Sequence, residues 1–404
     1  MKKYELLAPA GNFEKLKTAF YFGADACYFA GKKYGLRAFS DNFTDDELEK
    51  SVEYAHKLGK KAYITLNIIA HNSDFDGLKE YVLYLQKIGA DAVICADVGI
   101  IKLIREVAPK LNVHVSTQAN ITNVHTAKFF AEMGVTRLIL ARELSFDEIK
   151  EIRQNIPANI EIETFVHGAM CISYSGRCLL SNYLTGRDSN RGACVQACRW
   201  CYTIKATDRN DEYEIQEDDR GTYILNSKDL CMIEYLTKLM EIGVTSFKIE
   251  GRMKSPYYVA TVVNAYRRAL DLALSNPNDY KCPQELIDEL GKTSHRPYTT
   301  GFYMGSNDRE NLATSMTLQT HEFIAMVVSC DERGNAVIEQ RNKFVKGDEL
   351  EVLSPNASFN KIIKIDHMVD DDGEVVEVAN KVQQHLHIKT PYQLHAGDIL
   401  RKKL

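Results

Sequence analysis

Five of the ten cysteines of this chain lie in one polar, glycine-containing segment, residues 163–202. Cys171 and Cys178 are separated by six residues, and Cys194 and Cys198 by three. The three glycines between the first and last of these cysteines allow turns tight enough to bring four sulfurs together. Isolated cysteines are often small core residues, but five in one polar loop indicate a metal centre. Thiolates suit an iron–sulfur cluster as well as structural zinc, so the spacing leaves the metal open.

Acid–base side chains accompany the cysteines. Glu163 and His167 precede them on one face of an apolar strand. Lys248, Glu250 and Arg252 lie further along the chain at the same period-two spacing. His167, Glu163 and Glu250 are therefore candidate catalytic residues for proton transfer. A buried ion network without chemistry is the alternative interpretation of such a set.

Repeated βα units must position these residues. From residue 5 to about 252, short apolar runs alternate with amphipathic stretches. In FGADACYF, IGADAVIC, MGVTRLIL and IGVTSFKI, a glycine suited to a helix C-cap precedes an apolar strand. The expected strands are Leu6–Ala8, Ala26–Phe29, Ala62–Leu66, Ala92–Ala96, His114–Gln118, Arg137–Ala141, Ile160–Val166 and Ser246–Ile249. The expected helices include Asp45–Leu58, Leu78–Ile88, Thr126–Met133, Phe146–Gln154, Asp229–Ile242 and Tyr257–Ser275.

Eight such units favour an α/β fold, a closed TIM-like (β/α)8 barrel. A doubly wound sheet is the alternative, but its GxGxxG loop is missing after the first strand. In a barrel, residues at the C-terminal ends of the strands converge on the active-site mouth. Those expected there are Asn67, Asp97, Gln118, Asn120, Arg142, His167, Glu250 and Arg252. The long insertion 168–245 before the last strand should place its cysteines over this mouth.

The segments ETFVHGAMCISYSGRCLLS, NRGACVQACRW and FKIEGRMKSPYYVA resemble the signature of peptidase family U32, the collagenase-like peptidases. The likeness extends from LLAPAGN to the carboxyl end and is greatest to the tRNA hydroxylation protein P branch. Members of that branch form 5-hydroxyuridine at the tRNA wobble position with prephenate. Relatives hydroxylate a ribosomal RNA cytidine or a ubiquinone precursor.

The resemblance implies a 4Fe–4S cluster with four cysteine ligands, which are Cys171, Cys178, Cys194 and Cys198. Cys201 and Cys231 are the alternatives for the fourth ligand. It also implies a substrate site for prephenate, whose carboxylates suit the bidentate guanidinium group. The residues assigned to substrate binding are Asn67, Gln118, Arg142 and Arg252, with Arg187 as a further candidate.

Composition sets broad bounds. With 404 residues, 45% hydrophobic and 26% charged, the chain suits a globular protein with one large and one smaller domain. A formal net charge of −5 excludes a uniformly basic surface but allows a local patch for RNA phosphates. No apolar run has membrane-spanning length, so we expect no membrane partner. The absence of an apolar signal core and the many cysteines predict a cytoplasmic protein.

We divide the chain into a barrel (1–275), a connector (276–313) and a small C-terminal β-barrel domain (314–404), where the hydrophobic period falls to two. The connector offers candidate substrate contacts, His295, Arg296, Tyr298 and Tyr303. Small β-barrels often bind nucleic acid. The basic residues available for this are Lys343, Lys346, Lys361, Lys364, Arg401, Lys402 and Lys403. A structural or dimerising domain is the alternative.

Residues and resemblance together predict an RNA-modifying enzyme, a prephenate-dependent tRNA uridine hydroxylase with an iron–sulfur cluster. An anticodon base is already single-stranded, so extruding it costs little. A metallopeptidase is the rival class, although neither HExxH nor GxSxG occurs. These residues are also compatible with a hydroxylase of ribosomal RNA cytidine or a quinone precursor, and with a cluster-bearing scaffold without turnover.

Overall fold

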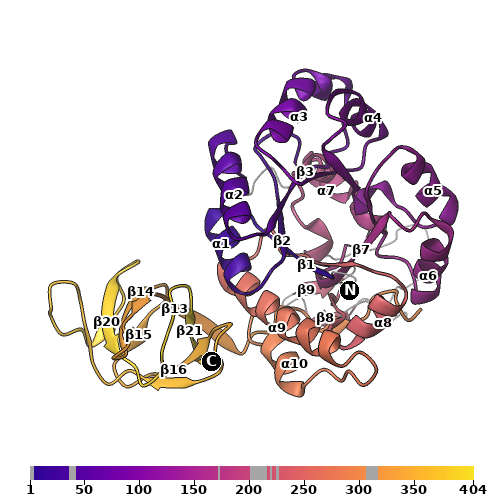
Figure 1. The fold of residues 1–404 in the computed structure, drawn as a ribbon. Coiled ribbons are helices and arrows are strands. Elements are labelled where there is room, and N and C mark those ends of the chain that lie inside the picture. The colour runs from indigo at the N-terminus through magenta and orange to yellow at the C-terminus, as the bar shows by residue number, and fades with distance from the viewer. Residues whose placement is uncertain are drawn as a thin grey trace.

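The computed structural model describes residues 4–35, 42–171, 173–200, 216–218, 221–223, 227–305 and 317–404. Eight parallel strands form a barrel: β1 (Glu5–Pro9), β2 (Ala26–Phe29), β3 (Lys61–Leu66), β4 (Ala92–Cys95), β5 (Asn112–Val115), β6 (Arg137–Ile139), β7 (Glu161–Ala169) and β11 (Ser246–Ile249). Neighbours follow chain order, and β11 pairs with both β1 and β7, which closes the sheet (Figure 1). The predicted barrel is confirmed, and the alternative of an open doubly wound sheet is wrong.

Helices surround the strands on the outside of the barrel (Figure 1). They are α1 (Phe13–Tyr21), α2 (Asp45–Lys57), α3 (Leu78–Lys87), α4 (Val98–Val107), α5 (Val124–Glu132), α6 (Phe146–Asn155), α8 (Leu236–Glu241) and α9 (Pro256–Ser275). Capping boxes begin two of them, Thr44 with Glu47 and Ser145 with Glu148. The four glycines predicted to end helices have φ between 75° and 105°. Within the described residues, no helix has the length and apolar character needed to cross a membrane.

The predicted helix at Asp229–Ile242 is wrong in its first part. Asp229–Cys231 form a strand, β10, antiparallel to the end of β7, and a 3-10 turn precedes α8. Strand β7 can extend this far because Gly168 adopts a φ of 107°, and a Cβ there would lie 2.7 Å from the carbonyl oxygen of Glu250. Pairing with β7 satisfies backbone groups of residues 229–231, which decides against a helix.

The connector packs against the barrel. Its helix α10 (Gln284–Leu290) is followed by β12 (Tyr298–Thr299), which pairs in parallel with β10. The Tyr303 hydroxyl donates to the carbonyl oxygen of Phe165 (2.7 Å), and the His295 ring stacks on Tyr298. These contacts attach the connector to the end of β7, from which the cysteine-rich segment departs.

The predicted C-terminal all-β domain is confirmed and is antiparallel. Its strands are β13 (His321–Cys330), β14 (Asn335–Gln340), β15 (Phe344–Val345), β16 (Glu349–Leu353), β17 (Ile362–Lys364), β18 (Met368–Val369), β19 (Val378–Ala379), β20 (His385–Lys389) and β21 (Ile399–Lys403). Seven of them form one sheet in the order β17-β16-β21-β13-β14-β20-β18. This domain lies beside α9 and α10, outside the barrel wall (Figure 1).

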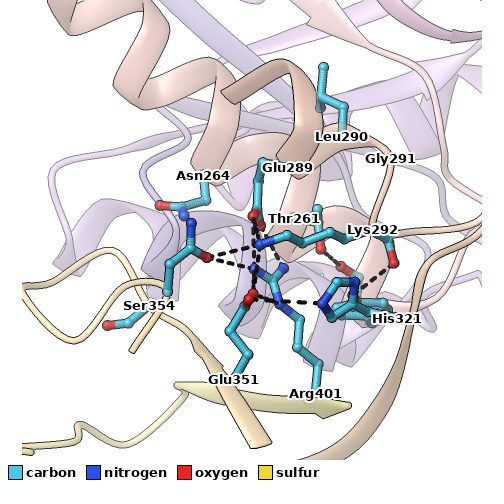
Figure 2. A network of polar contacts seen from close by, with 12 residues as sticks. Thr261, Asn264, Glu289, Leu290, Gly291, Lys292, His321, Glu351, Ser354 and Arg401 are labelled. Atoms are coloured by element: carbon cyan, nitrogen blue, oxygen red, sulfur yellow. Dashed lines mark hydrogen bonds and ion pairs between the residues drawn. The ribbon is translucent and has the colours of Figure 1, made fainter. Parts of the chain in front are cut away.

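A buried ion network joins this domain to the barrel (Figure 2). Both terminal nitrogens of Arg401 donate to the carboxylate of Glu289, and Glu351 accepts from the same guanidinium. Lys292 donates to Glu351 (2.7 Å) from the barrel side. The side chains of Arg401 and Glu289 are fully buried. The predicted contact of Arg401 with nucleic acid is therefore wrong, because its charge is neutralised inside the domain interface.

Candidate active site

A cavity lies at the C-terminal ends of the barrel strands, between the barrel and the cysteine-rich segment. Its lining includes the predicted residues Asn67, Gln118, Arg142, Glu250, Arg252, Cys171, Cys178, Cys194 and Cys198. The structure thus brings together, at one cavity, residues that the sequence places far apart. Asp97, Asn120 and His167 are not part of this lining. Asp97 instead caps α4, accepting from the backbone of Gly99 and Ile100.

Contacts on both sides hold the cysteine-rich segment over the barrel. Arg191 donates to both carboxylate oxygens of Asp74 (2.6 and 2.8 Å), and these hydrogen bonds lower the pKa of Asp74 to about 2. The Ser175 hydroxyl donates to Glu143 (2.6 Å), and the Ile69 amide donates to the carbonyl of Asn190 (3.1 Å). The cysteines are therefore carried by a segment that is attached at several points to the loops after β3 and β6.

The surroundings of the thiols fit metal-bound thiolates. The Leu180 amide donates to the sulfur of Cys178 (3.3 Å), and the Gln196 amide donates to that of Cys194 (3.3 Å). The Ser181 hydroxyl also points to the Cys194 sulfur (3.7 Å). Gln196 has a φ of 58°, an unusual backbone conformation for a residue with a side chain. Hydrogen bonds of this kind stabilise ligating sulfurs and tune cluster potentials.

Four thiols are available to hold a metal centre at this site. Cys171, Cys178, Cys194 and Cys198 all line the same cavity. Within the described ranges no three histidine, cysteine or carboxylate side chains are placed to hold one metal ion. A set of four thiolates is a donor set that fits an iron–sulfur cluster, and these four cysteines would be its ligands.

Cys231 and Cys201 are the two alternatives for the fourth ligand. Cys231 does not line the cavity; its thiol contacts the Tyr266 hydroxyl (3.8 Å), and burial raises its pKa to about 11. Cys201 lies outside the described residues. Among the described cysteines, Cys198 is thus the best fourth ligand.

Cationic side chains dominate the barrel side of the cavity. Arg142 donates to the Ala169 carbonyl (2.8 Å) with its guanidinium 3.8 Å from the centre of the Phe165 ring, and its Nε has no partner among the described residues. Arg252 donates to the Thr65 hydroxyl (3.2 Å). Lys248 also lines the cavity, a position that sequence reasoning assigned only to an ion network. Arg187 is exposed and does not line the cavity. Three cations facing one cavity favour an anionic ligand.

Glu163 lies in a buried ion network, apart from the cavity lining. Lys248 donates to one of its oxygens (2.8 Å), and Arg137 donates to the other (2.9 Å) and to Glu5 (2.6 Å). Burial lowers the pKa of Lys248, while the charge of Glu163 opposes that shift. The interpretation of Glu163 as part of an ion network is the one its contacts support. Its predicted catalytic role remains a prediction, and its contact with the cavity is indirect, through Lys248.

His167 is buried in an aromatic environment. Its ring lies 5.3 Å from Tyr266 and 5.4 Å from Tyr298, measured between ring centres. Neither ring nitrogen has a hydrogen-bond partner among the described residues. Burial lowers the pKa of this imidazole to about 3, so it is neutral at physiological pH. None of the predicted connector contacts lines the cavity either, and Tyr298 instead packs against His167.

Acidification should destabilise the wild-type protein more than a His167→Phe variant. An unfolded histidine takes up a proton near pH 6.5, whereas the folded His167 stays neutral down to about pH 3. The unfolded state therefore binds more protons below about pH 6.5, and stability falls as the pH falls, by up to about 1.4 kcal/mol per pH unit. Urea unfolding at about pH 7 and pH 5.5 measures this difference. Equal pH dependence of the two proteins would contradict a neutral buried imidazole.

The fold and the site define a closed (β/α)8 barrel protein with a cavity at its mouth that is lined by four cysteines and by charged side chains. Comparison with known protein families identifies the family to which this barrel protein belongs. A model of peptidase family U32 matches residues 11–313, and one of the peptidase family U32 C-terminal domain matches residues 319–401. The chain belongs to peptidase family U32.

Two of the following three relatives match nearly the whole chain, and the third matches about three quarters of it. The chain is similar to tRNA hydroxylation protein P1 of Bacillus subtilis, with 42% identity over 99% of this chain and 95% of that protein. It is 38% identical to tRNA hydroxylation protein P of Escherichia coli, over 94% of this chain and 92% of that protein. A 23S rRNA 5-hydroxycytidine synthase of E. coli is 37% identical, over 74% of this chain and 45% of that protein.

Proposed function

We propose that this protein is an RNA-hydroxylating enzyme that converts the wobble uridine of tRNA to 5-hydroxyuridine, with prephenate as co-substrate and a 4Fe–4S cluster as cofactor. The observation that carries this proposal is the shared cavity, where four thiols face two arginines and a lysine. Similarity to two tRNA hydroxylation proteins over 99% and 94% of this chain favours tRNA as the substrate.

The cavity residues have distinct roles in this proposal. Arg142, Arg252 and Lys248 bind the carboxylates of prephenate, and the burial of Arg252 and Lys248 strengthens these ion pairs. Asn67 donates to Gln118 (2.9 Å), and this amide pair offers both donors and acceptors to the polar edge of a uracil base. Glu250 is the one predicted catalytic residue that lines the cavity, where it is placed to accept a proton. A 4Fe–4S cluster held by these four cysteines would supply one-electron transfer when bound.

The C-terminal domain is proposed to contribute to RNA binding through its exposed lysines. Lys346, Lys364 and Lys402 are each paired with an acidic side chain. Lys343, Lys361 and Lys403 are exposed and remain the best candidates for phosphate contacts.

Cells that lack this protein should lose 5-hydroxyuridine, and the wobble derivatives built on it, from their tRNA. Mass spectrometry of tRNA nucleosides measures this loss, and ribosomal hydroxycytidine should be unchanged. Complementation with Arg142→Ala or Arg252→Ala should fail to restore the modification while the purified variants keep their iron, because each arginine holds a carboxylate rather than the cluster. A charge-assisted hydrogen bond of about 1.5–3 kcal/mol predicts a loss of roughly 10- to 100-fold in kcat/KM for prephenate.

Lys79→Ala, an exposed change on α3, is the matched control and should complement fully. Normal tRNA nucleosides with missing hydroxycytidine would move the assignment to ribosomal RNA. Gelatin cleavage by the pure protein, blocked by chelation, would instead favour a peptidase. Cluster binding without any turnover would support the alternative of a non-catalytic, cluster-bearing scaffold.

A further inference from the structure

The short helix α7 (Leu180–Thr185) has an apolar face that no other part of the described structure covers. Leu179 is 72% exposed, Tyr183 86% and Leu184 42%. We call these three side chains the α7 face. Leu179 and Tyr183 are four residues apart, so they lie on the same side of the helix. Apolar side chains that cluster on a surface mark a binding site more often than isolated ones do.

The opposite side of α7 is buried against the cysteines. Ser181 is buried, accepts a hydrogen bond from the Val195 amide (3.2 Å) and points to the sulfur of Cys194. Cys178 precedes the helix and Ser189 follows it, and both line the cavity. The helix therefore lies between two lining residues in the chain, although none of its own residues lines the cavity. Its inner side contacts Cys194, one of the proposed cluster ligands, and the α7 face is exposed on the helix away from that contact.

The segment that carries the α7 face is rich in arginine, although the whole chain has a net charge of −5. Residues 173–198 contain three arginines and a single acidic residue, Asp188. Arg191 is paired with Asp74, Arg177 donates through Nε to the carbonyl oxygen of Gln118 (2.7 Å), and the Arg187 side chain is exposed. Exposed aromatic and arginine side chains next to each other are the pattern that binds single-stranded nucleic acid. Three side chains expose far less than the roughly 800 Å² that each partner buries in a stable protein complex, which argues against a protein partner.

We propose that the α7 face binds the unpaired nucleotides next to the base that enters the cavity, with one of their bases stacked on the Tyr183 ring and Arg187 contacting a phosphate. This inference rests on the proposed function, because it concerns how the RNA is held beside the same cavity. It assigns recognition of the anticodon loop to the cysteine-rich segment itself.

Binding of a fluorescently labelled anticodon stem-loop RNA to the cluster-containing protein, measured by anisotropy without oxygen, tests this inference. Tyr183→Ala should weaken binding by about 5- to 100-fold, because a stacked base is lost, and Tyr183→Phe should bind within about twofold of wild type. Phe129→Ala removes an aromatic ring that is 51% exposed on α5, and it should bind like wild type. Tyr183→Ala should leave the salt dependence unchanged, whereas Arg187→Ala should reduce its slope by about one ion.

The single tryptophan of the chain provides a second readout. Trp200 is 43% exposed at the end of the same segment, so its fluorescence should change when the RNA binds. Iron content should be the same in wild type and in each variant, which separates RNA binding from cluster loss. Wild-type protein that does not bind the RNA would overturn the proposed function together with this inference. Equal binding by wild type and Tyr183→Ala would overturn this inference alone, as would sedimentation that shows wild type self-associating and Tyr183→Ala monomeric.

Discussion

Protein purified without oxygen should lose its iron and acid-labile sulfide when any one of Cys171, Cys178, Cys194 and Cys198 is replaced by alanine. Each of the four thiols lines the cavity, and removing one of four thiolate ligands weakens the attachment of a cubane cluster. Iron and sulfide analysis and the broad visible absorption of the cluster measure the loss, which we expect to be nearly complete for each variant.

Two cysteines outside the cavity are matched controls. Cys27 is buried in β2 and Cys231 lies in β10, so Cys27→Ala and Cys231→Ala should keep iron and sulfide at the wild-type level. Stoichiometric zinc without sulfide in the wild-type protein would refute the cluster. Retention of the cluster by Cys198→Ala, together with its loss from Cys201→Ala, would assign the fourth ligand to Cys201.

Replacing Glu289 with alanine should destabilise the whole protein by about 3–5 kcal/mol, because it leaves Arg401 charged and buried without its main partner. Chemical denaturation measures this change. Arg401→Met should be similarly destabilising, since it leaves Glu289 in the same position. The double variant Glu289→Met/Arg401→Met removes both charges and should recover most of the stability, because two apolar side chains of similar volume can replace a buried ion pair.

An exposed ion pair of the C-terminal domain is the control for this experiment. Lys346 and Glu377 are 3.0 Å apart with both side chains largely exposed, so Glu377→Ala should change stability by less than about 1 kcal/mol. If Glu289→Ala were no more destabilising than Glu377→Ala, the network would not hold the two domains together. A stacked pair across the same interface, Tyr257 and Phe323, also makes deletion of the C-terminal domain an unsuitable test of its role in RNA binding.

The barrel could be predicted from sequence because local signals and overall fold agree in it. Apolar runs of strand length, capping boxes and glycines such as Gly23 and Gly89 each require only neighbouring residues, and the structure shows the expected strands and positive φ angles. The convergence of Arg142 and Arg252 also followed, since barrel topology alone brings the ends of the strands together.

The remaining features depend on contacts that no local pattern contains. Asp229–Cys231 have a helical context but pair with the end of β7. Arg401 begins a run of three basic residues, Arg401–Lys403, which is typical of an exposed strand end, and its burial depends on Glu289, which is far away in sequence. His167 lies near the end of an apolar strand, yet it is buried among tyrosines from α9 and the connector.

The two halves of the cavity come from different segments of the chain, and this has an evolutionary consequence. One continuous insertion supplies all four cysteines, whereas the loops and strands of the barrel supply the arginines and amides. Under the proposed function, mutations at the strand ends can alter the anion or base that is bound without changing any of the four cysteines. Gene duplication in such a family can therefore produce paralogues with new substrates that keep the same cysteine-rich segment.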